Sequence, residues 1–381
     1  MAVCTAGSFL WSPPASEASA GKNGVLSAVA CVKGPTCEAV GTYFDSQGTS
    51  VAFGEGWKGD SPALQSVVLP SGPLHQSSLD GVACVNAHFC VAVGSYSTRG
   101  GRAMTLAERW NGSQWLVEPT PTPNGRSPEV AGVACVASEW CMAVGGYQDS
   151  RGAFVPMSLE RVAGSWHLQY PPVPLGPESD AAASLLAVSC TSSSSCIAIG
   201  DYRTVEQRQV PLGVQWNGSS WSLLIPPAPA SPQASLSGVS CEASVRCVAV
   251  GYQQVGALRY RGLAESLGSS WSAVSVPTPK GASVVQLASV ACPSTTTCEA
   301  VGNDVSGSQT TLAAQWTTTG WTIASTPSVS DVNSSLLSSI SCVSRAWCLA
   351  VGNAVTRGNE GEVLAMVLSE GRWKMMASKS P

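Results

Sequence analysis

The sequence predicts an all-β fold, a seven-bladed β-propeller with four antiparallel strands per blade and one disulfide in each blade. Two observations lead to this prediction. A pair of cysteines separated by five residues, followed by an apolar run that ends in glycine, occurs seven times, and successive copies begin 50 to 55 residues apart. The composition is also turn-rich, with 38 Gly and 25 Pro in 381 residues, as is usual in chains of many short strands.

Each copy is expected to contain four strands, and the second copy illustrates them. Residues 79–84 are small and apolar, which suits a buried strand crowded around the propeller axis. Residues 90–96 form the second strand, after a loop of hairpin length. Residues 103–110 and 114–119 form the third and fourth strands, and the Asn-Gly at 111–112 between them is a strong hairpin signal.

Tryptophans recur around the turn between the third and fourth strands. Two copies read Trp110-Asn-Gly-Ser-Gln-Trp115 and Trp216-Asn-Gly-Ser-Ser-Trp221. Regularly repeated residues usually serve packing between repeats. We therefore expect these side chains to form the core between adjacent blades, in preference to the alternative of ligand stacking.

Fourteen of the 15 cysteines fall into the seven pairs. Zinc sites favour shorter cysteine spacings with histidines nearby, and the chain has only three His. We therefore predict local disulfides formed in an oxidising compartment, over the alternative of free thiols buried as small hydrophobic side chains. The predicted pairs are Cys31–Cys37, Cys84–Cys90, Cys135–Cys141, Cys190–Cys196, Cys241–Cys247, Cys292–Cys298 and Cys342–Cys348.

The N-terminal segment stands outside this pattern. Residues 25–381 are expected to form the propeller, and the segment 1–24, in which Gly7-Ser-Phe-Leu-Trp11 resembles a fourth strand, is expected to supply a ring-closing outer strand. Cys4 is unmatched, which makes it a candidate for an intermolecular disulfide. No basic region followed by a long apolar core marks a secretory signal in this chain, yet the cysteine pattern indicates a secreted or cell-surface protein.

The charge content argues against several classes of partner. Charged residues make up 12% of the chain, and the formal net charge is −4, so no basic patch suited to nucleic acid is expected. No apolar run reaches the roughly 20 residues that a membrane span requires. No cofactor motif and no metal site are recognised.

The repeat resembles one found in many exported bacterial proteins, with C-x5-C-x-A-V-G and W-N-G-x-x-W in each blade. The resemblance covers nearly the whole chain and implies a propeller architecture without a particular activity. The turn before the second tryptophan is also distantly similar to the Asp-box of sialidase-like propellers. Because Trp110 and Trp216 stand at the aspartate position, the hydrolase chemistry of those propellers is not expected here.

A matched catalytic constellation is not recognisable. His75, His88 and His167 occupy unrelated positions in their repeats, so convergence on one acid–base site is not expected. Four aspartates do recur just after the second strand, and they are expected to form Asx turns in preference to a cation site. They are Asp45, Asp149, Asp201 and Asp304. The chain is expected not to be an enzyme.

Candidate binding residues lie on the connections between the second and third strands, because function in repeat arrays tends to sit on loops that depart from the repeat. The tyrosines there are open to two interpretations, a ligand-binding ring or blade packing. The candidates are Tyr43, Tyr96, Tyr147, Tyr202, Tyr252, Arg99, Arg102, Arg151, Arg203 and Arg357.

These observations favour a non-enzymatic extracellular or cell-surface propeller that binds or scaffolds a protein or surface polymer. One alternative is a carbohydrate-binding lectin with repeated blade sites. Another is a hydrolase or lyase acting at the central channel, which a buried, shifted carboxylate pair or a bound metal would favour.

Overall fold

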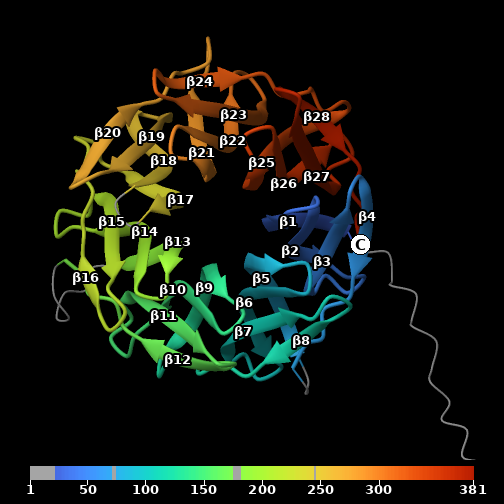
Figure 1. Cartoon of the computed structure of the whole chain (residues 1–381), viewed down its shortest axis with the longest axis vertical. Coiled ribbons are helices and arrows are strands. Elements are labelled where there is room, and N and C mark those ends of the chain that lie inside the picture. The colour runs from blue at the N-terminus through green and yellow to red at the C-terminus, as the bar shows by residue number, and fades with distance from the viewer. Residues whose placement is uncertain (1–21, 71–73, 175–181, 244–245) are drawn as a thin grey trace, which may run out of the picture.

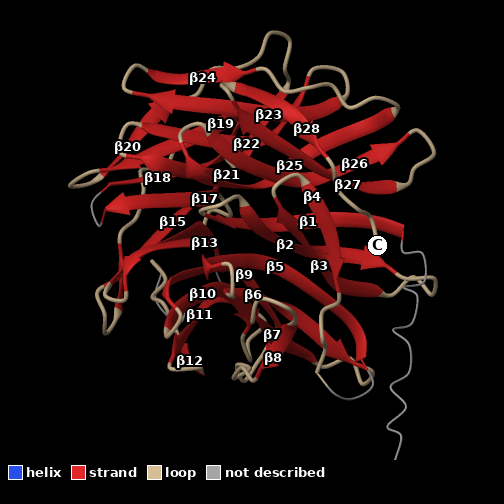
Figure 2. Ribbon diagram, turned by 45° about the vertical axis from the view of Figure 1, so that its right-hand side comes forward, coloured by secondary structure: helices blue, strands red, loops and turns tan. Residues whose placement is uncertain are grey.

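The computed structural model describes residues 22–70, 74–174, 182–243 and 246–381. This part of the chain folds into 28 strands and contains no helix (Figure 2). No helix of the described residues could therefore span a membrane. The strands form seven units of four, and within each unit every strand pairs antiparallel with the next along the chain. The predicted all-β class and repeated four-stranded sheets are confirmed.

The strands are named in chain order, four to a unit. The innermost strands are β1 (Lys22–Val32), β5 (Leu74–Asn86), β9 (Arg126–Ala137), β13 (Ala183–Ser192), β17 (Ala234–Ala243), β21 (Val284–Ser294) and β25 (Val332–Ser344). The second strands are β2 (Thr36–Phe44), β6 (Phe89–Thr98), β10 (Trp140–Gln148), β14 (Ser195–Arg203), β18 (Arg246–Gly256), β22 (Thr297–Val305) and β26 (Trp347–Thr356). The third strands are β3 (Ser50–Lys58), β7 (Ala103–Trp110), β11 (Phe154–Val162), β15 (Gln209–Trp216), β19 (Arg259–Leu267), β23 (Gln309–Thr317) and β27 (Gly361–Ser369). The outer strands are β4 (Ser61–Gln65), β8 (Trp115–Glu118), β12 (Ser165–Gln169), β16 (Trp221–Leu223), β20 (Trp271–Ser275), β24 (Gly320–Ala324) and β28 (Arg372–Met376).

The units stand side by side around a common axis, with the innermost strands nearest to it (Figure 1). Successive hairpins define two faces. The disulfide face carries the turns between first and second strands and between third and fourth strands. The link face carries the turns between second and third strands and the connections from one unit to the next.

The core is divided among the boundaries between units. Each hydrophobic cluster of the described residues combines side chains from two neighbouring units, and together they account for every boundary around the ring. Tryptophans lie in these clusters, as Trp115 does between units one and two and Trp373 does between units six and seven. The predicted packing role of the repeated tryptophans is confirmed for these residues.

The first and last units close the ring. Backbone N–H groups of Val29 and Cys31 donate to Ser339 and Ser341 Oγ at 3.2 and 2.9 Å. Trp57 Nε1 donates to the carbonyl oxygen of Ala377, after β28, at 2.9 Å. The outer strand of unit seven is β28 itself. The ring-closing strand expected in residues 1–24 lies outside the described residues up to residue 21, and residues 22–24 belong to β1.

All seven predicted disulfides are present, from Cys31–Cys37 to Cys342–Cys348. Each joins the ends of an inner and a second strand, and the paired Cα atoms are 4.0–4.1 Å apart. In every unit, the glycine four residues after the second cysteine lies opposite a β-bulge in the inner strand. In unit two, a Cβ at Gly94 would overlap the carbonyl oxygen of Ser78, which explains why the apolar run ends in glycine.

Candidate functional site

The five candidate tyrosines are half-buried and lie in five different units. Tyr43 packs edge-on against Phe53, with ring centroids 5.9 Å apart. Tyr252 packs edge-on against Tyr260, and Tyr147 packs against Tyr170 in a tilted arrangement. Tyr96 and Tyr202 pack against clusters between units. Burial raises the pKa of Tyr43. The tyrosines therefore contribute to packing around the ring and are not brought together into one site.

The candidate arginines are exposed on the link face, spread over units two, three, four and seven. Arg151 forms an ion pair with Asp149 at 3.0 Å within its own hairpin. The other members of this set are Arg99, Arg102, Arg203 and Arg357. Their distribution around the ring provides separate contact points on one face and no convergent pocket.

The recurring aspartates organise turns or local contacts. Asp45 Oδ1 accepts from the backbone N–H groups of Gln47 and Thr49, both at 2.8 Å, and Asp149 Oδ1 does the same with Arg151 and Ala153. This is the expected Asx-turn role. Asp201 and Asp304 accept instead from nearby hydroxyl groups.

The two histidines whose side chains are described, His88 and His167, do not form a site with one another. His88 and His167 are exposed in units two and three, and the side chain of His75 lies outside the described part of the structure. No group of three or more His, Cys, Asp or Glu within the described residues could hold a metal ion.

A hydrogen bond between units recurs on the outer part of the ring. The indole N–H of the outer-strand tryptophan donates to an acceptor in the preceding unit, and we call this contact the inter-unit indole bond. It joins Trp115 to Gln65 Oε1 at 2.7 Å, Trp166 to Glu118 Oε2 at 3.0 Å, Trp221 to Ser158 Oγ at 3.0 Å and Trp271 to the Leu224 carbonyl oxygen at 3.0 Å.

Unit six interrupts this series on both sides. Trp321 and Trp373 are buried, with exposed fractions of 5% and 7%, and neither indole N–H has a hydrogen-bond partner among the described residues. By strand register, Val274 and Ala324 occupy the position that Gln65 and Glu118 occupy in units one and two. A buried donor without a partner is costly, so these two boundaries differ energetically from the four that carry the inter-unit indole bond.

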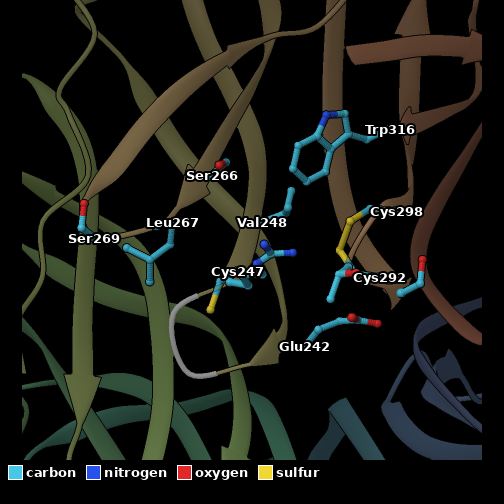
Figure 3. Close-up of a pocket in the computed structure, with 13 residues that line it drawn as sticks. Glu242, Cys247, Val248, Ser266, Leu267, Ser269, Cys292, Cys298 and Trp316 are labelled. Atoms are coloured by element: carbon cyan, nitrogen blue, oxygen red, sulfur yellow. A yellow bond between two sulfur atoms is a disulfide. The ribbon is translucent and has the colours of Figure 1, made fainter. Parts of the chain in front are cut away.

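A cavity of about 560 Å³ opens on the disulfide face between units five and six. Figure 3 shows the indole of Trp316 projecting into it, with Leu267 on the unit-five side and the Cys292–Cys298 disulfide on the unit-six side. Polar side chains complete the lining, namely Glu242, Arg246, Ser266, Ser269, Ser294 and Thr295. An apolar lining with a few polar groups is the usual composition of a site that binds a small molecule or a side chain of a partner protein.

Trp316 differs in orientation from its counterparts. Trp110 and Trp216 donate their indole N–H to carbonyl oxygens of Ala87 and Ser193 in the adjacent cysteine loops, at 3.3 and 3.0 Å. Trp316 makes no such bond with a described residue, is half-buried, and stacks on Trp321 at an interplanar angle of 21°. The corresponding pairs in units two and four are tilted by 48° and 49°. The face and N–H of Trp316 are therefore available to the cavity.

Sequence reasoning did not single out Trp316, although a signal was present. Cys298 pairs with Trp316 in the register that pairs Cys90 with Trp110 and Cys196 with Trp216. The chain between the paired residues is two residues shorter in unit six. This departure from the repeat marks the unit whose tryptophan is reoriented.

Buried carboxyl groups at the boundaries were also not predicted. Burial raises the pKa of Glu108 to about 8, with a further contribution from the charge of Glu118, and burial raises the pKa of Glu265 to about 7. Neither carboxyl oxygen of Glu108 has a hydrogen-bond partner among the described residues. These side chains follow the alternation of the third strand into the core and face neighbouring units. A neutral carboxyl group is the form compatible with that position.

No protein-family model and no curated protein sequence matches the chain. Among solved structures, the chain is similar to a polysaccharide lyase, the PL25 ulvan lyase, with a TM-score of 0.61, 10% identity, and coverage of 93% of this chain and 96% of the lyase. It is also similar to YCF48 bound to a D1 peptide, with a TM-score of 0.47, 13% identity and coverage of 83% and 87%. A lectin from Aleuria aurantia with a six-bladed β-propeller fold gives a TM-score of 0.47, 13% identity and coverage of 80% and 95%. These neighbours are β-propeller proteins, and at such identities the likeness concerns the fold alone.

Proposed function

We propose that this chain is a non-enzymatic, extracellular or cell-surface binding protein, a closed seven-bladed propeller that holds part of a protein or surface polymer in the cavity between units five and six. The observation that carries the proposal is the orientation of Trp316, whose ring faces a cavity of about 560 Å³ instead of bonding to its own cysteine loop. The disulfide in each unit supports an oxidising location.

The lining indicates what kind of ligand part fits. An indole face stacks on the apolar face of a sugar ring or on a peptide side chain. The hydroxyl groups of Ser266, Ser269, Ser294 and Thr295, with Glu242 and Arg246, provide donors and acceptors around that ring. A lectin with one equivalent site per blade is less well supported, because the inter-unit indole bond distinguishes four boundaries from those that flank unit six.

The link face supports a second candidate, in which a protein partner docks on the turns between second and third strands. Val205 and Leu258 lie in these turns of units four and five, with exposed fractions of 73% and 83%. The exposed candidate arginines lie in the same class of turns. Apolar tips beside arginines are typical of protein contacts.

The two candidates are separated by two variants and one screen. Wild-type protein, Trp316→Ala and Leu258→Ser are applied to glycan and peptide arrays under non-reducing conditions. A cavity ligand is expected to lose its signal with Trp316→Ala and to keep it with Leu258→Ser. The reverse pattern supports the link face, and a screen in which Trp316→Ala changes no signal contradicts the proposal for the cavity.

A further inference from the structure

The boundary between units one and two shows how an outer-strand glutamine fills the space between units. Gln65 Nε2 donates to Glu38 Oε2 at 2.7 Å, and Gln65 Oε1 accepts from Trp115 Nε1 at 2.7 Å. Gly56 leaves the room for this arrangement, because a Cβ there would overlap the Gln65 amide. The carboxyl group, the amide and the indole thus form one continuous chain of hydrogen bonds.

The boundary between units six and seven has the same carboxyl group and the same indole, but two neighbouring residues differ from those in unit one. Glu299 follows the second cysteine as Glu38 does, and Trp373 corresponds to Trp115. Gln315, at the position of Gly56, donates to Glu299 Oε1 at 2.6 Å. Ala324, at the position of Gln65, has no side-chain acceptor. The carboxyl group is therefore paired within unit six, and the N–H of Trp373 lacks the partner that its counterpart has.

A cavity of about 480 Å³ lies at this boundary, lined by Glu299, Gln315, Ala324 and Trp373. Thr322, Ser325 and Thr326 also line it, as do Arg345 and Arg372. Arg345 donates to Thr296 Oγ1 at 3.0 Å across the boundary. Arg372 is exposed and has no ion-pair partner among the described residues.

Three requirements define the ligand. It must bring an acceptor for the buried indole N–H, because Trp373 is 7% exposed and unpartnered. It must bring hydroxyl groups that match the carboxyl, amide and hydroxyl groups of the lining. It must carry negative charge for the two arginines, which favour planar carboxylates. The volume suits one or two monosaccharide units.

We propose that the cavity between units six and seven is a binding site for an acidic saccharide, a hydroxyl-bearing ring with a carboxylate. The carboxylate lies toward Arg345 and Arg372, and a ring or hydroxyl oxygen occupies the acceptor position that the Gln65 side chain fills between units one and two. This site is separate from the cavity at Trp316 and does not depend on it.

Binding of a short glucuronic acid oligomer is compared with that of a glucose oligomer of the same length by calorimetry. The wild-type protein is expected to bind the acidic oligomer in preference to the neutral one, and more weakly as salt rises. Arg372→Ala and Trp373→Phe are each expected to weaken binding about tenfold, as removal of one charge contact or one hydrogen bond does.

Gln315→Gly/Ala324→Gln provides the decisive variant. It installs the acceptor of unit one together with the glycine that leaves room for it, so it is expected to abolish binding while the melting temperature stays equal or rises, which separates loss of the site from loss of the fold. Ser266→Gly/Val274→Gln is the matched control at the boundary between units five and six, and it is expected to leave binding of the acidic oligomer unchanged.

Equal binding of the acidic oligomer by wild type and Gln315→Gly/Ala324→Gln overturns the proposal, as does equal affinity for the acidic and neutral oligomers or no binding of either. Trp316→Ala distinguishes this result from the proposed function, because that substitution removes the ring from the other cavity and is expected to leave this site intact.

Discussion

Arg161 donates from Nε and Nη2 to the two carboxylate oxygens of Glu118, each at 2.7 Å, across the boundary between units two and three. The side chains of this ion pair are only 5% and 11% exposed. Trp166 Nε1 donates to the same carboxylate at 3.0 Å. One glutamate therefore serves both as the acceptor of an inter-unit indole bond and as the partner of a buried guanidinium group.

Truncation of this pair is predicted to be strongly destabilising. Arg161→Ala leaves the buried Glu118 carboxylate with Arg109, at 3.2 Å, in place of its bidentate partner, so the cost is expected to be about 3 kcal/mol, at the low end for breaking a buried ion pair. The measurement is urea unfolding at pH 7 with the disulfides intact. Lys374→Ala serves as the control, because its ion pair with Glu370 is exposed and is expected to contribute less than about 1 kcal/mol. Similar losses for the two variants would contradict a special role for the buried pair.

The inter-unit indole bonds predict a difference between two chemically identical substitutions. Trp115→Phe removes the donor to Gln65 Oε1 and leaves a buried amide oxygen unsatisfied, whereas Trp321→Phe removes an N–H that has no partner. Both substitutions shorten the ring in the same way, so their packing losses are comparable. Trp115→Phe is expected to be more destabilising by about 1–2 kcal/mol. The free energies of unfolding from urea titrations test this, and an equal loss at both positions would refute it.

The disulfides are predicted to stabilise each unit separately. Each closes a loop with five residues between its cysteines, for which the chain-entropy estimate is about 2 kcal/mol. Replacement of Cys84 and Cys90 by serine is expected to lower stability by that amount without dissolving the ring, since the neighbouring units keep their own disulfides. Titration of thiols in the unfolded, non-reduced protein is expected to find none from the fourteen paired cysteines. Recovery of fourteen or more would contradict the pairing.

The repeat in the sequence was sufficient to predict which residues pair within a unit. Cys84 and Cys90 are near neighbours in the chain, and Gly94 is needed for a bulge in the same sheet, so both leave a local pattern. Contacts across a boundary leave no local pattern. Gln65 and Trp115 are 50 residues apart, and the acceptor that Gln65 provides becomes Glu118, Ser158 or a backbone carbonyl elsewhere.

The two cavities also lie at boundaries between units, which is why the sequence did not predict them. The cavity between units six and seven depends on a missing acceptor, because Ala324 lies beside Trp373. The cavity between units five and six depends on the orientation of one side chain, that of Trp316. Strand periodicity identifies the face on which a side chain lies but not its partner in the next unit. The tyrosines recur regularly in the sequence, and Tyr43, Tyr96 and Tyr147 pack against clusters between units.

Stability is predicted to fall as pH rises from about 4.5 to about 8. Burial raises the pKa of Glu108 to about 8 and the pKa values of Glu55 and Glu265 to about 7, from an ordinary value of 4.5. Above pH 4.5 the unfolded chain releases these protons while the folded chain retains them, so the folded state binds more protons and loses stability with rising pH until its own pKa values are passed. Glu108→Gln keeps the shape and removes the titration. Relative to that variant, the wild-type free energy of unfolding should decrease between pH 5 and pH 8 in urea titrations, and a difference that is constant with pH would show that the Glu108 carboxyl group is not held neutral in the folded protein.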